Sequence, residues 1–205
     1  MARRAKTACG PDLPISTLRM QPERCAGVAR EPVRSAQDAW AALRHAFSGC
    51  GAQERFVALH LDSKLRPIAV QEVSRGGLAS TEVDPRVLFG GAVAVGARSL
   101  IVAHNHPTCE LSPSPEDFAL TERLRAAGKL LGVGVIDHLI ACEGKNEARS
   151  IRETEQGNRL FQGAVAGAAQ GGRGKRDARK RRGRLRFADY PLPEPAPVWR
   201  VAGRR

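Results

Sequence analysis

The sequence has few aromatic residues and no long uncharged apolar run. Phe, Trp and Tyr together make up 4% of its 205 residues. The apolar run 87–97 is about half as long as the roughly 20 residues that a membrane-spanning helix needs. Basic residues near the N-terminus have no apolar segment behind them, so we expect no secretory signal. These absences predict a cytoplasmic protein with no membrane contact, whereas an apolar content of 42% is adequate for a folded core.

The cysteines form no CxxC pair, and the chain shows no internal repeat. There are five of them, an odd number: Cys9, Cys25, Cys50, Cys109 and Cys142. In a chain without an export signal, this pattern predicts free thiols in a reducing cytoplasm.

The net charge of +12 is distributed unevenly along the chain. Residues 1–35 carry seven Lys and Arg against three acidic residues, and residues 36–170 carry fourteen against fifteen. Residues 171–205 carry twelve against three. A near-neutral middle between two basic ends predicts one folded domain with basic extensions.

The extensions have compositions that do not favour a core. Residues 1–34 are basic and proline-containing, and we expect them to be irregular. Residues 163–205 are first Gly/Ala-rich and then Arg/Lys-rich, with nine Lys and Arg within 173–186. Such a run repels itself and predicts a disordered tail. It also favours nonspecific binding to DNA or RNA phosphates, with no support for base-specific readout.

The middle segment, 35–162, alternates strand and helix patterns. We expect helices at 35–49, 85–97 and 115–131, strands at 54–62, 67–75, 99–106 and 133–142, and a short strand and helix within 143–162. Ser114 is a suitable N-cap for the longest helix, with Pro115 at its first position, and Gly132 ends it. This order predicts an α/β fold with a mixed sheet that helices cover.

A cluster of polar residues follows the strand pattern at 99–106. The sequence His104-Asn105-His106-Pro107 is followed by six residues, then Ser114, two residues and Asp117. Side chains two apart in an extended chain point to the same side, so both imidazoles can face one ion. Asp117 lies in the first helical turn beyond the loop. Two histidines and one carboxylate predict a zinc site with a fourth position for water, whose pKa zinc lowers from 15.7 to about 7.

Such a site needs a group that accepts and returns a proton. Glu54, at the start of the first strand, is the favoured candidate, and Glu72 in the second strand is the alternative. Ser114 could orient the water or donate to a developing oxyanion. A serine cap and first-turn acids also stabilise any helix, so Ser114 and Asp117 have a structural explanation as well.

This spacing resembles the JAMM (MPN) metalloprotease signature, which is a distant Glu followed by HxHP, six residues, Ser, two residues and Asp. Residues 52–140 more closely resemble the bacterial RadC family. The similarity rests on four stretches in order: EVSRGGLAS, DPRVLF, AHNHPTCELSPSPED and TERLRAAGKLLGVGVIDHLI. The resemblance implies a cytidine-deaminase-like JAB fold and zinc at His104, His106 and Asp117. It also implies Glu54 as acid/base and Ser114 as the oxyanion helper.

Three departures from the RadC pattern bear on function. About fifty residues precede Glu54, with a single clear helix, where the family usually has a larger helical region. The loop TCELSP brings Cys109 and Glu110 near the proposed metal, and the chain diverges from the family pattern after Cys142. We expect a zinc-dependent metallohydrolase that cleaves a peptide or isopeptide-like amide. The alternative is a DNA-associated accessory protein that uses the basic tail.

Two further histidines have competing interpretations. Asp137 and His138 end a strand pattern, either as a pair that supports the metal ligands or as a buried structural histidine with its neighbour. His60 is expected to be an ordinary strand residue. The oligomeric state and the identity of the substrate have no signature in the sequence.

Overall fold

The computed structural model describes residues 31–76 and 83–162. Predictions for residues 1–30, for the tail 163–205 and for its basic run 173–186 lie outside the described residues. Among the described residues, no helix combines the length and apolarity needed to cross a bilayer.

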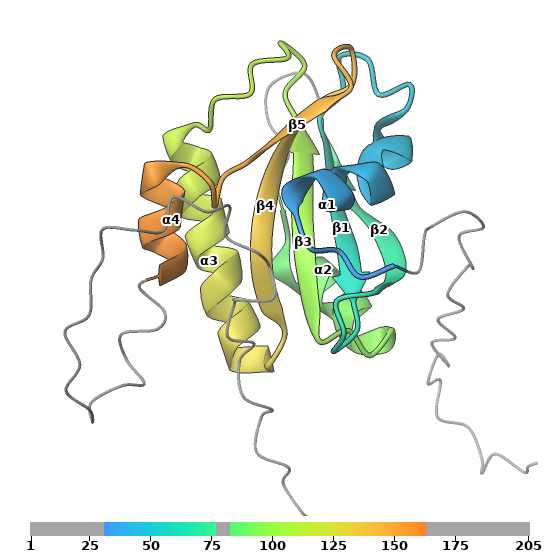
Figure 1. The fold of residues 1–205 in the computed structure, drawn as a ribbon, viewed down its shortest axis with the longest axis vertical. Helices are drawn as coiled ribbons and strands as arrows, with labels where there is room; N and C mark the ends of the chain where they lie inside the picture. The colour runs from blue at the N-terminus through green and yellow to red at the C-terminus, as the bar shows by residue number, and fades with distance from the viewer. Residues whose placement is uncertain (1–30, 77–82, 163–205) are drawn as a thin grey trace, which may run out of the picture.

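A five-stranded mixed sheet forms the centre of the molecule, as the sequence predicts (Figure 1). Its strands, in spatial order, are β2 (Pro67–Arg75), β1 (Arg55–Leu61), β3 (Ser99–Asn105), β4 (Gly134–Cys142) and β5 (Glu147–Ser150). The β3–β4 pair is parallel, and the other three pairs are antiparallel. Every residue of β3 and β4 is buried, because helices cover the two faces of the sheet and other strands pair along both sides of this central pair.

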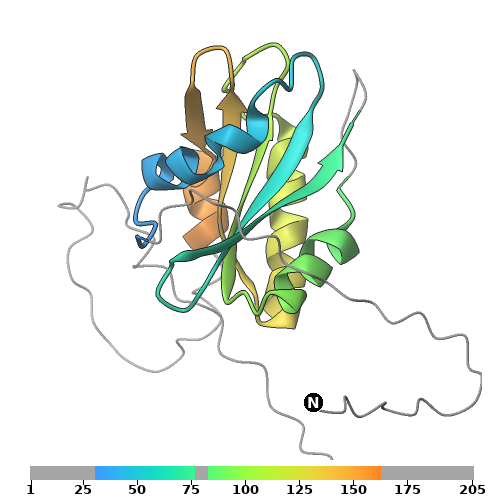
Figure 2. The same ribbon diagram turned by 90° about the vertical axis from the view of Figure 1, so that its right-hand side faces the viewer.

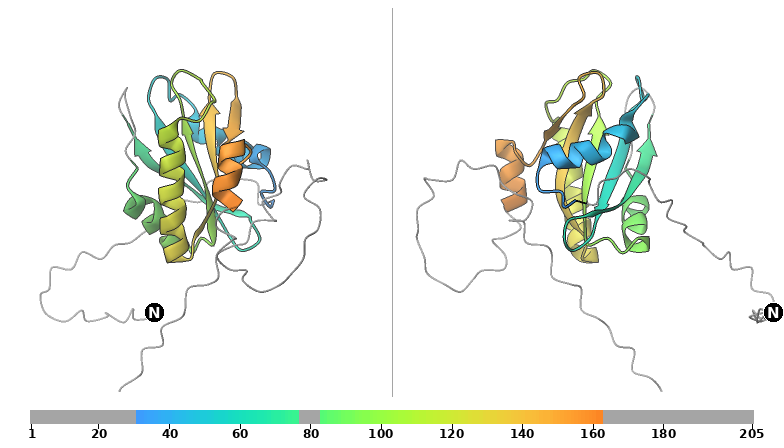
Figure 3. Two further views of the ribbon diagram at one scale, coloured as in Figure 1. Left: turned by 90° about the vertical axis from the view of Figure 1, so that its left-hand side faces the viewer. Right: turned by 45° about the vertical axis from the view of Figure 1, so that its right-hand side comes forward.

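Helices cover both faces of the sheet. Figure 2 shows α1 (Ala36–Leu43) on one face and α2 (Pro85–Ala94) and α3 (Pro115–Leu131) on the other. α4 (Glu155–Gln162) lies beside α3 (Figure 3), where the Arg125 guanidinium sits 4.1 Å from the centre of the Phe161 ring. Successive side chains of the strands point to opposite faces of the sheet and form two apolar clusters. One cluster packs against α1, and the other packs against α2 and α3.

The α3 helix has the limits that its local sequence predicts. Ser114 accepts a hydrogen bond from the Asp117 amide, and the Asp117 carboxylate accepts one from the Ser114 amide, which forms a capping box. Pro115 is at the first helical position, and Gly132 ends the helix with φ of 69°, a conformation that glycine adopts readily. These signals hold Asp117 in the first turn, directly after the loop that leaves β3.

Two helices are shorter than expected. The helix predicted at 35–49 is α-helical only to Leu43 and continues as a 3-10 turn, η1 (Arg44–Phe47). The helix predicted at 85–97 ends at Ala94, because Gly96 adopts a φ of 68° that breaks the helical backbone. The central strands β3 and β4 still lie within one residue of their predicted limits.

The prediction of free cysteines is wrong for one pair. Cys109 and Cys142 form a disulfide, whereas Cys50 is a buried free thiol. The sequence spacing of these two cysteines gives no pairing signal, because β4 brings the second one beside the loop after β3 only in the folded chain.

Candidate metal centre

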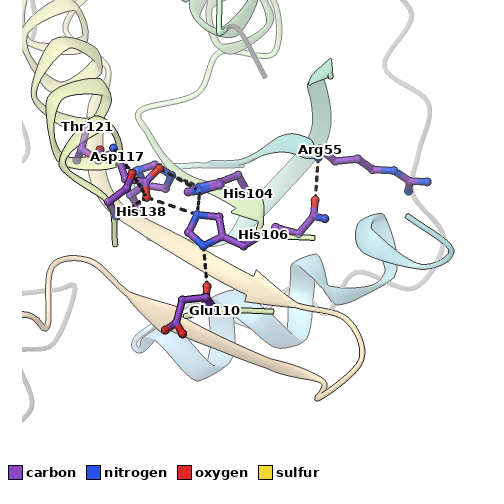
Figure 4. Close-up of polar contacts among 9 residues, drawn as sticks. Arg55, His104, His106, Glu110, Asp117, Thr121 and His138 are labelled. Atoms are coloured by element: carbon purple, nitrogen blue, oxygen red, sulfur yellow. Dashed lines mark hydrogen bonds and ion pairs between the residues drawn. The ribbon is translucent and has the colours of Figure 1, made fainter. Parts of the chain in front are cut away.

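The two histidines and Asp117 meet where β3 ends and α3 begins (Figure 4). His104 Nε2 lies 2.9 Å from His106 Nε2 and 3.1 Å from Asp117 Oδ1. His106 Nε2 lies 3.5 Å from Asp117 Oδ2. The alternation of β3 and the capped start of α3 thus bring the three predicted ligands together.

The geometry of these donor atoms fits one small cation. The candidate ligand atoms of the three residues all lie within 4.8 Å of one another. Ligand atoms around a tetrahedral zinc, each about 2.0–2.1 Å from the metal, are about 3.3 Å apart. The observed separations of 2.9–3.5 Å bracket that value. The donor set of two imidazoles and a carboxylate is also one that zinc accepts, so the residues present fit a divalent metal.

Each imidazole is oriented by a contact at its other nitrogen. His106 Nδ1–H donates to the Glu110 carbonyl at 2.6 Å, since a carbonyl oxygen can only accept. His104 Nδ1 lies 2.8 Å from His138 Nε2. Both Nε2 atoms therefore face the cluster, as metal-ligating histidines require when a second group holds the opposite nitrogen.

The electrostatics of the cluster favour a cation. Burial acts to raise the pKa of Asp117, but the close contacts of its carboxylate with the His104 and His106 rings outweigh burial and hold that pKa well below its usual range. The Asp117 carboxylate, 3.5 Å from His106 Nε2, raises the pKa of His106, and the Glu54 charge adds to this effect. An ionised carboxylate between two imidazoles thus creates a buried position that stabilises positive charge.

Ser114 is engaged with Asp117 in this structure. Its hydroxyl donates to Asp117 Oδ2 at 2.8 Å and accepts from the Asp117 amide at 3.1 Å. The structural explanation for this serine therefore applies, because it caps α3 and orients the carboxylate. Its role at an oxyanion stays a prediction, and requires the hydroxyl to turn away from Asp117.

Glu54 is close enough to the cluster for its charge to act on His106, and its backbone is fixed by several hydrogen bonds. The Asn105 side chain accepts a hydrogen bond from the Arg55 amide at 2.8 Å and donates one to the Gln53 carbonyl at 3.0 Å. It is therefore hydrogen-bonded to the backbone of both neighbours of Glu54. The Glu54 carbonyl also accepts from the Gly76 amide at 2.9 Å. Sequence reasoning missed Asn105. The signal was available, because a residue between two histidines of an extended strand must face the opposite side.

Glu72 has a different environment. Its two carboxylate oxygens accept hydrogen bonds from Arg75 at 3.0 and 2.9 Å, and this contact lowers the pKa of Glu72. Both partners of this ion pair are well exposed on β2. The surroundings therefore favour Glu54 over Glu72 as the group that exchanges protons at the site.

The disulfide anchors the loop that carries His106. Cys109 is three residues after His106, and its amide donates to the His106 carbonyl at 2.8 Å. Cys142 is the last residue of β4. Cys109 is therefore unavailable as a metal ligand, and the bond joins the ligand loop to a central strand.

Reducing this disulfide should lower the free energy of unfolding by about 3–4 kcal/mol, because a cross-link over 33 residues restricts the unfolded chain. Urea unfolding with and without reductant measures the change. A double variant, Cys109→Ala with Cys142→Ala, is the control, and reductant should leave its stability unaltered. Equal stability of the oxidised and fully reduced wild-type protein would contradict the prediction.

A family model described as a RadC-like JAB domain matches residues 33–157. A UPF0758 protein of Desulforudis audaxviator is 39% identical over 145 residues, which cover 71% of this chain and 55% of that protein. UPF0758 proteins of Nostoc sp. and Syntrophomonas wolfei are 44% and 45% identical over 101 and 91 residues. These matches cover 49% and 44% of this chain, and 41% and 39% of the two relatives. The chain spans about half the length of the curated relatives that it matches.

Proposed function

The chain belongs to the RadC-like JAB domain family, and on that premise we propose that it is a zinc-dependent metallohydrolase that cleaves a peptide or isopeptide-like amide. The observation that carries the proposal is the convergence of His104 Nε2, His106 Nε2 and the Asp117 carboxylate at separations suited to one metal. A metal that provides only structure is usually enclosed by four protein ligands, whereas three leave a position for water.

The residues around the cluster have distinct roles in this proposal. His104, His106 and Asp117 would hold the ion, which supplies polarisation of the scissile carbonyl and a lowered pKa for water. Glu54 accepts the proton of that water and delivers it to the departing amide nitrogen. Asn105 keeps the Glu54 segment beside the end of β3 through its two backbone contacts. The Ser114 hydroxyl, after turning from Asp117, donates to the oxygen on which negative charge develops.

The experiment that tests the proposal is an amide-hydrolysis assay on fluorogenic peptides and on peptides that contain an ε-lysyl isopeptide bond. Turnover should cease when a chelator removes the metal and return on addition of zinc. If the protein is fully loaded with zinc and cleaves none of these substrates, the result would contradict amide hydrolysis. It would not contradict the fold or the metal site.

We propose nonspecific DNA binding through residues 173–186 as the second candidate function, because this run holds nine Lys and Arg. Each phosphate contact releases counterions, so the affinity should fall steeply as salt increases. A chain that ends at residue 170 should lose most of this affinity while its zinc content is unchanged. Equal DNA affinity of the two chains, measured at several salt concentrations, would exclude the tail as the binding segment.

The cytoplasm stays a prediction for the location of this protein. Disulfides are rare in the cytosol and are usually redox-active there. The Cys109–Cys142 bond therefore makes thiol labelling in intact cells a direct test, since a reducing compartment should leave both cysteines open to alkylation.

A further inference from the structure

Behind the candidate metal centre, a buried hydrogen-bonded chain joins two of the three proposed ligands. The Thr121 hydroxyl lies 2.6 Å from the Asp117 carbonyl and 2.6 Å from His138 Nδ1. His138 Nε2 lies 2.8 Å from His104 Nδ1. Thr121 and His138 are fully buried, with exposures of 0%. This series of hydrogen bonds therefore runs from the backbone of Asp117 on α3, through His138 on β4, to the ring of His104 on β3 (Figure 4).

The direction of each hydrogen bond in this chain follows from counting protons. The Thr121 hydroxyl has one hydrogen and donates it to the Asp117 carbonyl, which can only accept. Thr121 Oγ1 must then accept from His138 Nδ1–H. A neutral imidazole has one N–H group, so His138 Nε2 accepts from His104 Nδ1–H. The remaining nitrogen of His104, Nε2, is left with its lone pair toward His106 and Asp117.

His138 occupies a site suited to a neutral ring. It lies in the buried strand β4, with the Phe56 ring edge-on at 5.5 Å between centroids. An imidazolium there would lose its hydration, which is costly in an apolar environment. The count of one N–H group for His138 therefore applies to the folded protein.

A histidine behind a metal ligand presents a problem that a carboxylate or carbonyl does not. Those groups only accept, so either fixes the ligand's N–H without ambiguity. A neutral imidazole can accept or donate at the same nitrogen, depending on its tautomer. If His138 carried its proton on Nε2, it would force His104 to present a deprotonated Nδ1 to it and a protonated Nε2 to the metal.

We propose that Thr121 and His138 are positioning residues for the metal centre, and that together they hold His104 in the tautomer whose Nε2 is free to bind the ion. Thr121 Oγ1 fixes the His138 proton on Nδ1, and the lone pair of His138 Nε2 in turn fixes the His104 proton on Nδ1. Because Thr121 is also bonded to the Asp117 backbone, the same chain sets the spacing between the ligand on β3 and the ligand on α3. This inference rests on the metal centre of the proposed function.

The sharpest variant is Thr121→Val, which removes the hydroxyl and keeps the shape of the side chain. We expect its zinc affinity to fall about 10–100-fold, the usual effect of removing a group that supports a metal ligand. His138→Leu should show a loss at least as large. Thr121→Ser restores the hydroxyl and should recover most of the affinity. Competition with a zinc-binding dye measures the dissociation constant, and cobalt absorption reports whether the coordination stays tetrahedral.

His60→Leu is the matched control for replacing a buried histidine of the same sheet. His60 is 1% exposed in β1 and bonds Gln71 at 2.9 Å. This variant should bind zinc as the wild-type protein does, so a general effect of removing a core imidazole is separated from a specific effect on the metal. Circular dichroism and thermal unfolding check the fold of every variant.

A second measurement keeps the inference testable if the His138 variant does not fold. Nitrogen-15 NMR of the imidazoles in the metal-free wild-type protein should find the His104 proton on Nδ1 and the His138 proton on Nδ1. A proton on His104 Nε2, or wild-type zinc affinity in Thr121→Val, would overturn the inference. A wild-type protein that binds no zinc would instead contradict the proposed function, so the two failures are distinguishable.

Discussion

Asp117→Asn is expected to abolish stoichiometric zinc binding and leave the fold in place. Asparagine keeps the shape of the side chain, and its amide oxygen can still accept from the Ser114 amide, which donates to Asp117 at 2.8 Å. The substitution removes the negative charge that two imidazoles surround. Because Asp117 is a direct ligand in the proposed site, the loss should exceed the 10–100-fold typical of a supporting residue. His104→Ala should have an equally large effect.

Elemental analysis after dialysis against buffered zinc measures this result, with one ion per chain expected for the wild-type protein. Glu116→Gln provides the matched control, since Glu116 is the neighbouring acid of the same helical turn and is exposed. It should keep its zinc. Full occupancy in Asp117→Asn or in His104→Ala would refute the ligand assignment, whatever the hydrolysis assay shows.

The parts of this site that could be predicted from the sequence are those encoded locally. The extended backbone at the end of β3 places His104 and the following His106 on one side, and Ser114, Pro115 and Gly132 fix where α3 begins and ends. The strand limits of β2 are likewise the predicted ones, Pro67–Arg75, because proline and a basic residue bound an alternating segment. Short-range backbone preferences decide all of these features.

The residues that support the ligands could not be predicted in the same way, because their partners are far apart in the sequence. Thr121 reaches His138 across 17 residues, and His138 reaches His104 across 34. These contacts exist only because β3 and β4 pair in parallel, with Val102 opposite His138 and His104 opposite Ile140. The Asp137-His138 pair could be noticed in the sequence, but whether it supports the metal or only the core depends on that register.

Asp137 illustrates the distinction. The Ser150 hydroxyl donates its one hydrogen to the Asp137 carboxylate, whose two oxygens lie 2.9 and 2.8 Å from it, and full burial raises the pKa of Asp137 to about 7. These contacts join β4 to β5 on the side away from the ligand rings. Asp137 thus joins two strands of the sheet, whereas its neighbour His138 contacts the proposed ligand His104.

Glu54→Gln is expected to reduce hydrolysis by about 10²–10⁴-fold, the usual contribution of a general acid–base group. The amide cannot accept the proton of the attacking water, but it matches the carboxylate in size, so the zinc content should not change. Single-turnover rates on a substrate that the wild-type protein cleaves, paired with elemental analysis, measure both quantities.

Glu72→Gln is the control that separates the two candidates left by the sequence. Glu72 is bound to Arg75 on the exposed side of β2, so its loss should break that ion pair and leave hydrolysis and zinc content near wild-type values. Glu54, by contrast, has both neighbours fixed by Asn105, which is the last residue of β3 and lies between His104 and His106 in the sequence. Asn105→Ala should therefore also lower the hydrolysis rate, by a smaller factor than Glu54→Gln, and leave the zinc content unchanged. If Glu72→Gln were the slower enzyme, the assignment of the acid/base to Glu54 would be wrong.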